Sequence, residues 1–274
     1  MILLNNTDNR AIGIFDSGFG GLTVLKEIEK KLSNENIIYF GDTARLPYGS
    51  KSRETIIKYS KEIYNFLKKK NVKLIVIACN TASSFALEAL QEISDIPVIG
   101  VIKAGSRCAS RESQGNILVI GTKGTIKSEV YKKEIHNINN NLNVYQQACP
   151  LFVPLVEEGM LNDEITTLSI KKYLDNYINN IDSILLGCTH YPLLKESIKN
   201  TYNKNINIIN PAEEVAEEVF NTLQKYNQLS NNKNRKIEFY VSDDKEKFIE
   251  YGSLFLGYNI TNVEEIDIEE YKKA

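Results

Sequence analysis

Short apolar runs alternate along the chain with longer stretches in which apolar residues recur at helical spacing. The runs are bounded by glycine and polar residues and rich in β-branched side chains, as in buried strands. In the first hundred residues the predicted strands cover 11–15, 37–40 and 74–78. The predicted helices that follow them cover 22–32, 53–70 and 82–93. This repeated order of strand and helix indicates an α/β fold with a mainly parallel sheet.

The same order recurs in the second part of the chain. Predicted strands at 117–120, 144–147 and 184–187 correspond to the first three, with a helix expected near Ser128. The spacing is nearly kept, because Ser17 to Cys79 spans 62 positions and Thr122 to Cys188 spans 66. We therefore expect two similar α/β domains with mainly parallel sheets, related by a pseudo-two-fold repeat and separated by a cleft that holds the active site.

The last part of the chain shows no third cysteine turn. It contains a predicted strand at 206–209, a helix at 212–226 and a strand at 237–241. We expect it to return to the first domain. The predicted domains are 1–97 plus 208–274 for the first and 98–207 for the second, with a hinge at 96–101.

Composition and charge exclude several classes of protein. Apolar residues make up 42% and charged residues 25%, as in an ordinary globular protein. Thirty-five acidic against 33 basic side chains leave a net charge of −2, so no nucleic-acid partner is expected. The apolar runs are far shorter than the roughly 20 residues of a membrane helix, and Met1–Leu4 lacks a signal-peptide pattern. We expect a cytoplasmic protein without a membrane partner.

Cysteine and histidine are too sparse for a metal site. The four cysteines form no CxxC pair, and only two histidines, His136 and His190, are present. We expect no metal and free thiols. Cys108 and Cys149 are expected to be structural.

The other two cysteines, Cys79 and Cys188, each end a predicted strand. Asn80 and Thr81 follow Cys79, and Thr189 and His190 follow Cys188. A cysteine at a helix start lies near unpaired amides and the positive end of the helix dipole, which favour thiolate. A lone cysteine is more often a small buried hydrophobe. Two in matching turns of facing domains, however, could lie on opposite sides of one small ligand.

Several segments resemble the signature motifs of the glutamate racemases in the aspartate/glutamate racemase family. They are DSGFGGLTV from Asp16, GDTARLPYGSKS from Gly41, ACNTAS from Ala78, GTKGTIKS from Gly121, LFVPLVEEG from Leu151 and GCTHYPLL from Gly187. The resemblance runs in order from about residue 11 to 225. It implies an isomerase that needs no cofactor and interconverts L- and D-glutamate for peptidoglycan synthesis, and so for cell-wall biogenesis and cell shape. We also expect a homodimer.

Position by position, the resemblance implies that Cys79 and Cys188 are the two acid/base residues. Cys79 would abstract the α-proton of D-glutamate and Cys188 that of L-glutamate. Asp16 would be the acidic partner of the first thiol. His190 would assist the second together with a glutamate of the VEEG segment, taken as Glu157 with Glu158 as the alternative. The implied substrate contacts are Asp16, Ser17, Pro47, Tyr48, Gly49, Asn80, Thr81, Thr122, Thr189 and His190.

The chemistry agrees with two opposed thiols, because removing a weakly acidic α-hydrogen needs a base on one face and a proton donor on the other. One alternative is a racemase of aspartate or another small acidic amino acid. A second is a cysteine hydrolase or amidotransferase with Cys188 as nucleophile and His190 as base, which leaves Cys79 unexplained. A third is a non-catalytic amino-acid binder.

Overall fold

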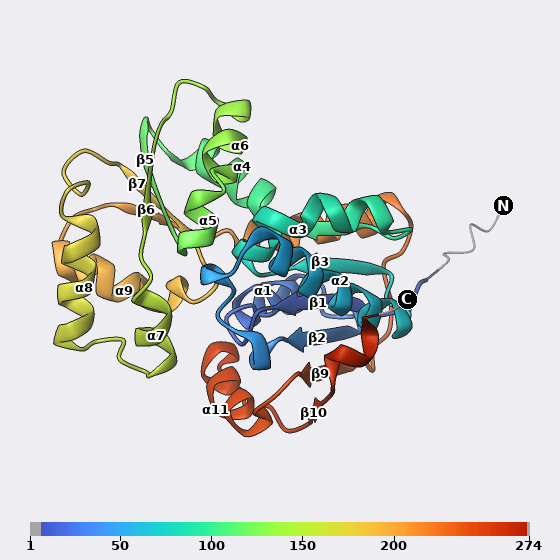
Figure 1. The fold of residues 1–274 in the computed structure, drawn as a ribbon. Helices are drawn as coiled ribbons and strands as arrows, with labels where there is room; N and C mark the ends of the chain where they lie inside the picture. The colour runs from blue at the N-terminus through green and yellow to red at the C-terminus, as the bar shows by residue number, and fades with distance from the viewer. Residues whose placement is uncertain (1–6, 273–274) are drawn as a thin grey trace.

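The computed structural model describes residues 7–272, which form two lobes, each built on its own parallel sheet (Figure 1). The apolar start at Met1–Leu4 and the outermost ends of the predicted first domain, residues 1–6 and 273–274, lie outside the described residues.

The first lobe contains a six-stranded sheet of order β10-β9-β2-β1-β3-β4. Its strands are β1 (Ile12–Asp16), β2 (Ile37–Gly41), β3 (Leu74–Ile77), β4 (Val98–Gly100), β9 (Ile237–Val241) and β10 (Val263–Glu265). The three strands β1, β2 and β3 are buried along their whole length, which explains why they form continuous apolar runs in the sequence.

Helices cover both faces of this sheet. One face packs against α2 (Arg53–Lys69), α3 (Asn80–Ile93) and the short 3-10 helix η4 (Ile268–Tyr271). The other face packs against α1 (Leu22–Lys31), α10 (Ala212–Lys225) and α11 (Lys245–Leu256). The loop between β2 and α2 carries two more 3-10 turns, η1 (Thr43–Arg45) and η2 (Tyr48–Ser50).

The second lobe contains a four-stranded sheet of order β6-β5-β7-β8. Its strands are β5 (Asn116–Gly121), β6 (Asn143–Ala148), β7 (Ser183–Gly187) and β8 (Asn207–Ile209). One face packs against α4 (Val101–Glu112) and α6 (Val130–Ile138). The other face packs against α7 (Phe152–Glu157), α8 (Glu164–Leu174), the 3-10 helix η3 (Tyr191–Leu194) and α9 (Lys195–Tyr202), while α5 (Lys123–Lys127) follows β5.

The predicted α/β fold with two similar, parallel halves is confirmed. In the first sheet β1 lies between β2 and β3, and in the second β5 lies between β6 and β7. The first strand of each repeat therefore lies between the second and the third. This arrangement places the residues after β1, β3, β5 and β7 at the carboxyl edges of the two sheets, where open α/β sheets bind ligands.

The expectation that the strand at 206–209 returns to the first domain is wrong. β8 pairs in parallel with β7, so it belongs to the second sheet. It follows β7 through α9, and consecutive strands joined by a helix are usually neighbours in one sheet. β4, in turn, belongs to the first sheet although the second domain was expected to begin at residue 98. We propose that the domains divide after Gly100 and again after Ile209.

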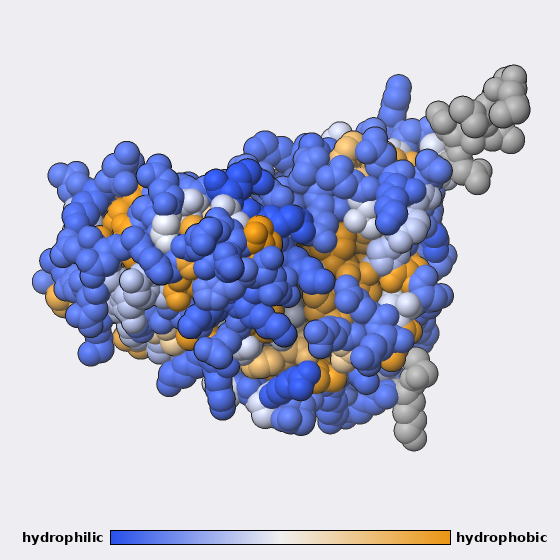
Figure 2. Space-filling view, turned by 90° about the horizontal axis from the view of Figure 1, so that it is seen from above, coloured by the Kyte–Doolittle hydropathy of each residue, from blue (hydrophilic) through white to orange (hydrophobic). Residues whose placement is uncertain are grey.

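The face of the molecule seen in Figure 2 is mostly hydrophilic, with hydrophobic side chains gathered in small patches. Within residues 7–272, no helix combines the length and the apolar character needed to cross a membrane.

Candidate active site

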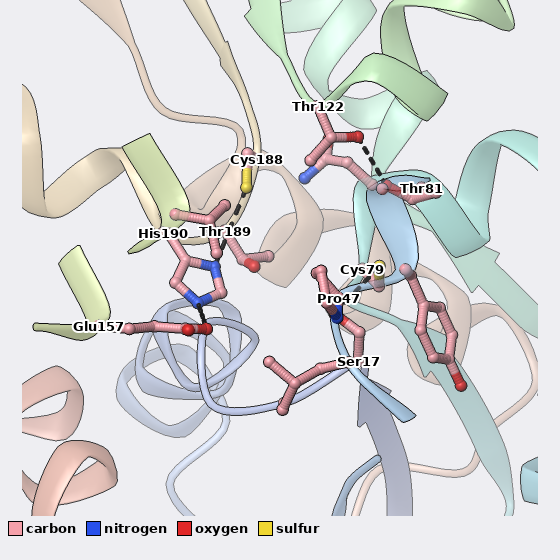
Figure 3. Close-up of a pocket in the computed structure, with 15 residues that line it drawn as sticks. Ser17, Pro47, Cys79, Thr81, Thr122, Glu157, Cys188, Thr189 and His190 are labelled. Atoms are coloured by element: carbon pink, nitrogen blue, oxygen red, sulfur yellow. Dashed lines mark hydrogen bonds and ion pairs between the residues drawn. The ribbon is translucent and has the colours of Figure 1, made fainter. Parts of the chain in front are cut away.

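A cavity lies between the lobes at the carboxyl edges of both sheets (Figure 3). About 30 Å³ is free inside it, close to the volume that one water molecule takes up in the liquid. Most of the side chains singled out from the sequence line this cavity: Ser17, Pro47, Tyr48, Gly49, Cys79, Asn80, Thr81, Thr122, Glu157, Cys188, Thr189 and His190. The exception is Asp16.

The first thiol, Cys79, directly follows β3 and is the N-cap of α3. Its Sγ accepts a hydrogen bond from the Ala82 amide at 3.4 Å and donates toward Ser17 Oγ at 3.8 Å. Burial raises the pKa of the Cys79 thiol to about 12, and the Asp16 carboxylate adds to the increase, while the Ala82 and Ser17 contacts oppose it. The predicted place at a helix start is confirmed. The expected preference for thiolate is wrong for Cys79, because burial outweighs the helix amide.

Asp16, the last residue of β1, is fully buried. Its Oδ2 accepts the Gly18 amide at 3.1 Å, and within residues 7–272 its Oδ1 has no hydrogen-bond partner. Burial raises the pKa of Asp16, whereas the charge of His190 lowers it. Asp16 therefore acts on Cys79 through its charge from outside the cavity lining, and its predicted contact with a substrate stays a prediction.

The second thiol, Cys188, follows β7 but does not cap an α-helix. The chain continues into the 3-10 helix η3, so the expectation that both cysteines begin helices is wrong for this one. Cys188 Sγ lies 3.9 Å from His190 Nδ1, and His190 Nε2 lies 3.1 Å from Glu157 Oε1, as the dashed lines in Figure 3 show. The thiol, imidazole and carboxylate thus form a chain of three groups.

His190 is buried at the centre of this chain. Burial lowers the pKa of the imidazole, but the contacts with Cys188 and Glu157 more than offset that and raise it to about 10. An imidazolium is therefore favoured at neutral pH, and it lies 3.9 Å from the Cys188 sulfur. Of the two adjacent glutamates, Glu157 reaches His190 from the end of α7, while Glu158 follows the helix and lies outside the cavity lining.

The loop between β2 and α2 is held by a buried cluster of charges. Asp42 Oδ2 accepts the Arg45 Nε–H at 2.8 Å, and Arg45 also forms an ion pair with Glu62. The phenol of Tyr48 donates to Asp42, so this hydroxyl is engaged by the loop itself. Any contact of Tyr48 with a substrate would therefore come from its ring or backbone.

Two hydrogen bonds that involve lining residues join the lobes. Thr81 Oγ1 and Thr122 Oγ1 lie 2.9 Å apart (Figure 3), and Thr23 Oγ1 donates to the Thr189 carbonyl at 3.2 Å. At Gly20 an added Cβ would collide with Thr189 and with His190. Only glycine therefore allows the loop after β1 to approach the Cys188 turn this closely.

Three lining residues were missed from the sequence: Gly18, Leu46 and Val153. Each lies inside one of the motif segments, but glycine, leucine and valine have no polar side-chain group that would mark them as candidates for a site.

Within residues 7–272, no three His, Cys, Asp or Glu side chains are grouped so that they could hold a metal ion. The expectation of a reaction without a cofactor remains a prediction.

Known proteins resemble this chain over almost its whole length. Residues 12–219 match the family model described as Asp/Glu/Hydantoin racemase. A glutamate racemase from Geobacter metallireducens is 48% identical over 267 residues, which is 96% of this chain and 99% of that protein. One from Persephonella marina is 49% identical over 253 residues, covering 91% and 95%.

Solved structures agree. The crystal structure of a glutamate racemase from Francisella tularensis in complex with D-glutamate superimposes with a TM-score of 0.91 at 42% identity, covering 96% of this chain and all of the other. The family model covers well over half of the chain, and the curated relatives share more than 30% identity over nearly all of it. The chain therefore belongs to the aspartate/glutamate racemase family, alongside its glutamate racemases, and is an isomerase of the amino-acid racemase class.

Proposed function

We propose that this chain interconverts L- and D-glutamate with two opposed thiols and without a metal or organic cofactor. The observation that carries the proposal is that Cys79 and Cys188 line one cavity from opposite lobes. The glutamate racemases among its relatives and the D-glutamate in the Francisella structure support glutamate as the substrate.

In the direction from L-glutamate, the Cys188 thiolate takes the α-proton and becomes a thiol. The electron pair left on Cα is delocalised into the α-carboxylate, whose growing charge is stabilised by hydroxyl donors such as Thr81 and Thr189. The Cys79 thiol then delivers its proton to the opposite face and becomes a thiolate. The reverse direction uses the same two groups with their protonation states exchanged.

The surroundings of the two thiols favour one resting state. A pKa of about 12 keeps Cys79 protonated as a donor, while the cationic His190 lies beside Cys188, the proposed base for L-glutamate. The resting enzyme is therefore prepared for L-glutamate. After a turnover from L to D, the proton must return to Cys79 before the next L-glutamate reacts.

The small cavity requires the lobes to separate before a substrate enters. A free volume of about 30 Å³ is too small for an amino acid. Renewed contact between the lobes after binding would exclude water and bring both thiols to Cα.

Isotope labelling tests the two-thiol mechanism. Starting from L-glutamate in deuterated water, the D-glutamate product should carry deuterium at Cα from the first turnovers. The recovered L-glutamate should stay largely unlabelled early on, because the abstracting thiol keeps the original proton on its own face. Mass spectrometry of the separated enantiomers measures both.

Equal early labelling of recovered L-glutamate and product would contradict two opposed thiols and favour a single base that serves both faces. The same assay with L-aspartate separates the alternative substrate, since we expect kcat/KM to be far lower for aspartate. Hydrolase or amidotransferase chemistry would leave Cα unlabelled.

We further propose that the enzyme works as a homodimer in the cytoplasm and supplies D-glutamate for peptidoglycan, and so supports cell-wall biogenesis and cell shape. Its relation to glutamate racemases supports this role. Loss of the gene should make growth depend on added D-glutamate, and sedimentation of the pure protein should give twice the chain mass.

A further inference from the structure

Tyr131 on α6 of the second lobe reaches a residue that lines the cavity from the first lobe. Its phenol donates a hydrogen bond of 2.7 Å to Asn80 Oδ1, and both side chains are buried. The tyrosine fits against Gly105 and Gly187, where an added Cβ would come within 3.0 Å of its hydroxyl oxygen and 3.2 Å of its ring, respectively. Packing therefore holds Tyr131 in place, with its hydroxyl at Asn80.

Asn80 begins α3 directly after Cys79 and lines the cavity. A carboxamide has an acceptor oxygen on one side and a donor NH₂ group on the other. Because Tyr131 engages the oxygen, the NH₂ group is the side left for a ligand, and within residues 7–272 no protein acceptor is bonded to it. The cavity is thus offered a hydrogen-bond donor, which is what a carboxylate needs.

The protonation state of Tyr131 keeps this arrangement constant. Burial raises the pKa of the phenol well above its usual value, and the nearby Cys188 raises it further. The hydroxyl therefore keeps its proton over the whole range of pH in which a protein is folded and active. A phenolate could not donate to Asn80 Oδ1. It would accept from the Asn80 NH₂ group instead, and would therefore favour the carboxamide rotated by half a turn.

We propose that Tyr131 is a positioning residue for racemisation, whose hydroxyl orients the Asn80 carboxamide so that Nδ2 donates to a carboxylate of the substrate. This inference rests on the proposed racemisation of glutamate. Because the two residues belong to different lobes, the amide is oriented only when the lobes are in contact. An opened cleft leaves the amide free to turn, which weakens the grip on the product.

The first test is Tyr131→Phe, which keeps the ring and removes the hydroxyl. KM for both enantiomers of glutamate should rise about tenfold, the effect of one lost hydrogen bond to a charged ligand, while kcat stays within about threefold. Tyr64→Phe is the matched control. Tyr64 is buried in the first lobe, and its phenol donates to the Ile93 carbonyl at 3.4 Å, away from the cavity. This control should leave KM unchanged.

A double-mutant cycle separates orientation from packing. In an Asn80→Ala background there is no amide to orient, so adding Tyr131→Phe should change KM less than twofold. If Tyr131 mattered only for packing, its tenfold effect would appear in that background too.

Asn80→Asp tests the same idea without any change at Tyr131. The phenol can still donate to one carboxylate oxygen, but the other oxygen then presents an acceptor where the substrate carboxylate needs a donor. KM should rise at least tenfold above that of Asn80→Ala. This variant decides the matter even if Tyr131→Phe fails to fold.

Two results would overturn the positioning role while the wild type racemises glutamate: an unchanged KM in folded Tyr131→Phe, or an Asn80→Asp variant that binds as well as Asn80→Ala. A wild type that does not racemise glutamate would instead overturn the proposed function, and this inference with it.

Discussion

The turns that carry Cys79 and Cys188 follow equivalent strands of the two sheets, yet the two thiols have different chemical surroundings. Cys79 caps α3 among an amide, a hydroxyl and a buried carboxylate, and its pKa is raised to about 12. Cys188 leads into a 3-10 turn and lies beside His190, whose pKa is raised to about 10. A repeated fold thus gives two thiols the same place on a sheet without the same surroundings.

The difference suits a reaction that needs an acid and a base at once. Two identical sites would favour two thiols or two thiolates, and neither state can both remove and deliver a proton. Here burial favours the thiol at Cys79, whereas Cys188 lies beside a His190 side chain that favours the imidazolium form. In the proposed mechanism, this asymmetry would prepare one base and one acid before a substrate arrives.

Removing either cavity thiol should have the largest effect. Cys79→Ala and Cys188→Ala should each lower kcat/KM about 10³-fold or more, because each removes a positioned acid/base that both directions require. Cys108→Ala and Cys149→Ala remove buried thiols outside the cavity lining and serve as controls that keep most of the activity. A circular-dichroism-based racemisation assay measures all four. A folded Cys108→Ala variant as inactive as Cys79→Ala would contradict the assignment.

His190→Asn should slow proton transfer at Cys188 but not at Cys79, and should lower kcat/KM about 10²-fold. The loss must be equal in both directions, because the equilibrium constant of racemisation is one. The asymmetry should appear in the isotope effect on kcat/KM. Slow proton transfer at Cys188 should enlarge the effect for α-deuterated L-glutamate and shrink it for α-deuterated D-glutamate.

Asp16→Asn is the matching variant on the Cys79 side. It should enlarge the isotope effect for α-deuterated D-glutamate and shrink it for α-deuterated L-glutamate. Without the Asp16 charge the Cys79 thiolate is a weaker base, so abstraction from D-glutamate slows. In either variant, the isotope effects measured from L-glutamate and from D-glutamate could change by the same amount. That result would contradict separate roles for the two turns.

Alkylation of Cys79 should depend steeply on pH. The Cys79 rate with iodoacetamide should rise about tenfold per pH unit between about pH 7 and pH 10 without a plateau, because its thiolate fraction keeps growing below a pKa of about 12. Mass spectrometry of the modified peptide follows this site. A Cys79 plateau below about pH 9 would show that burial does not raise its pKa.

Tyr48→Phe should have the smallest effect. Its hydroxyl donates to Asp42, so removing it loosens the loop and should raise KM about threefold to fivefold with kcat nearly unchanged. Tyr59→Phe, whose ring lies beside that of Tyr48 and over Arg45, is the control and should have no effect. A 100-fold loss of kcat in Tyr48→Phe would mean that the phenol contacts the reacting substrate.

The local pattern of apolar and polar residues was enough to predict the strands that carry the site. Fully buried parallel strands are continuous apolar runs, and the polar residues after them mark the carboxyl edges, so the turns at Ser17, Cys79, Thr122 and Cys188 could be recognised. The strand at 207–209 was recognised too, but not its partner, because no local pattern states which strand it pairs with. Tyr131 was overlooked because a tyrosine in a helix looks like an ordinary core residue.

The sequence by itself determined the α/β fold, its internal repeat, the family and the two cysteines, because these follow from periodicity and from short motifs. Only the tertiary structure decided that Cys79 favours a thiol, that Glu157 reaches His190 and that Tyr131 holds Asn80. Each of these depends on burial or on contact between residues distant in the chain. The free energy of a charge or a hydrogen bond is set by such surroundings, and these exist only once the lobes have packed.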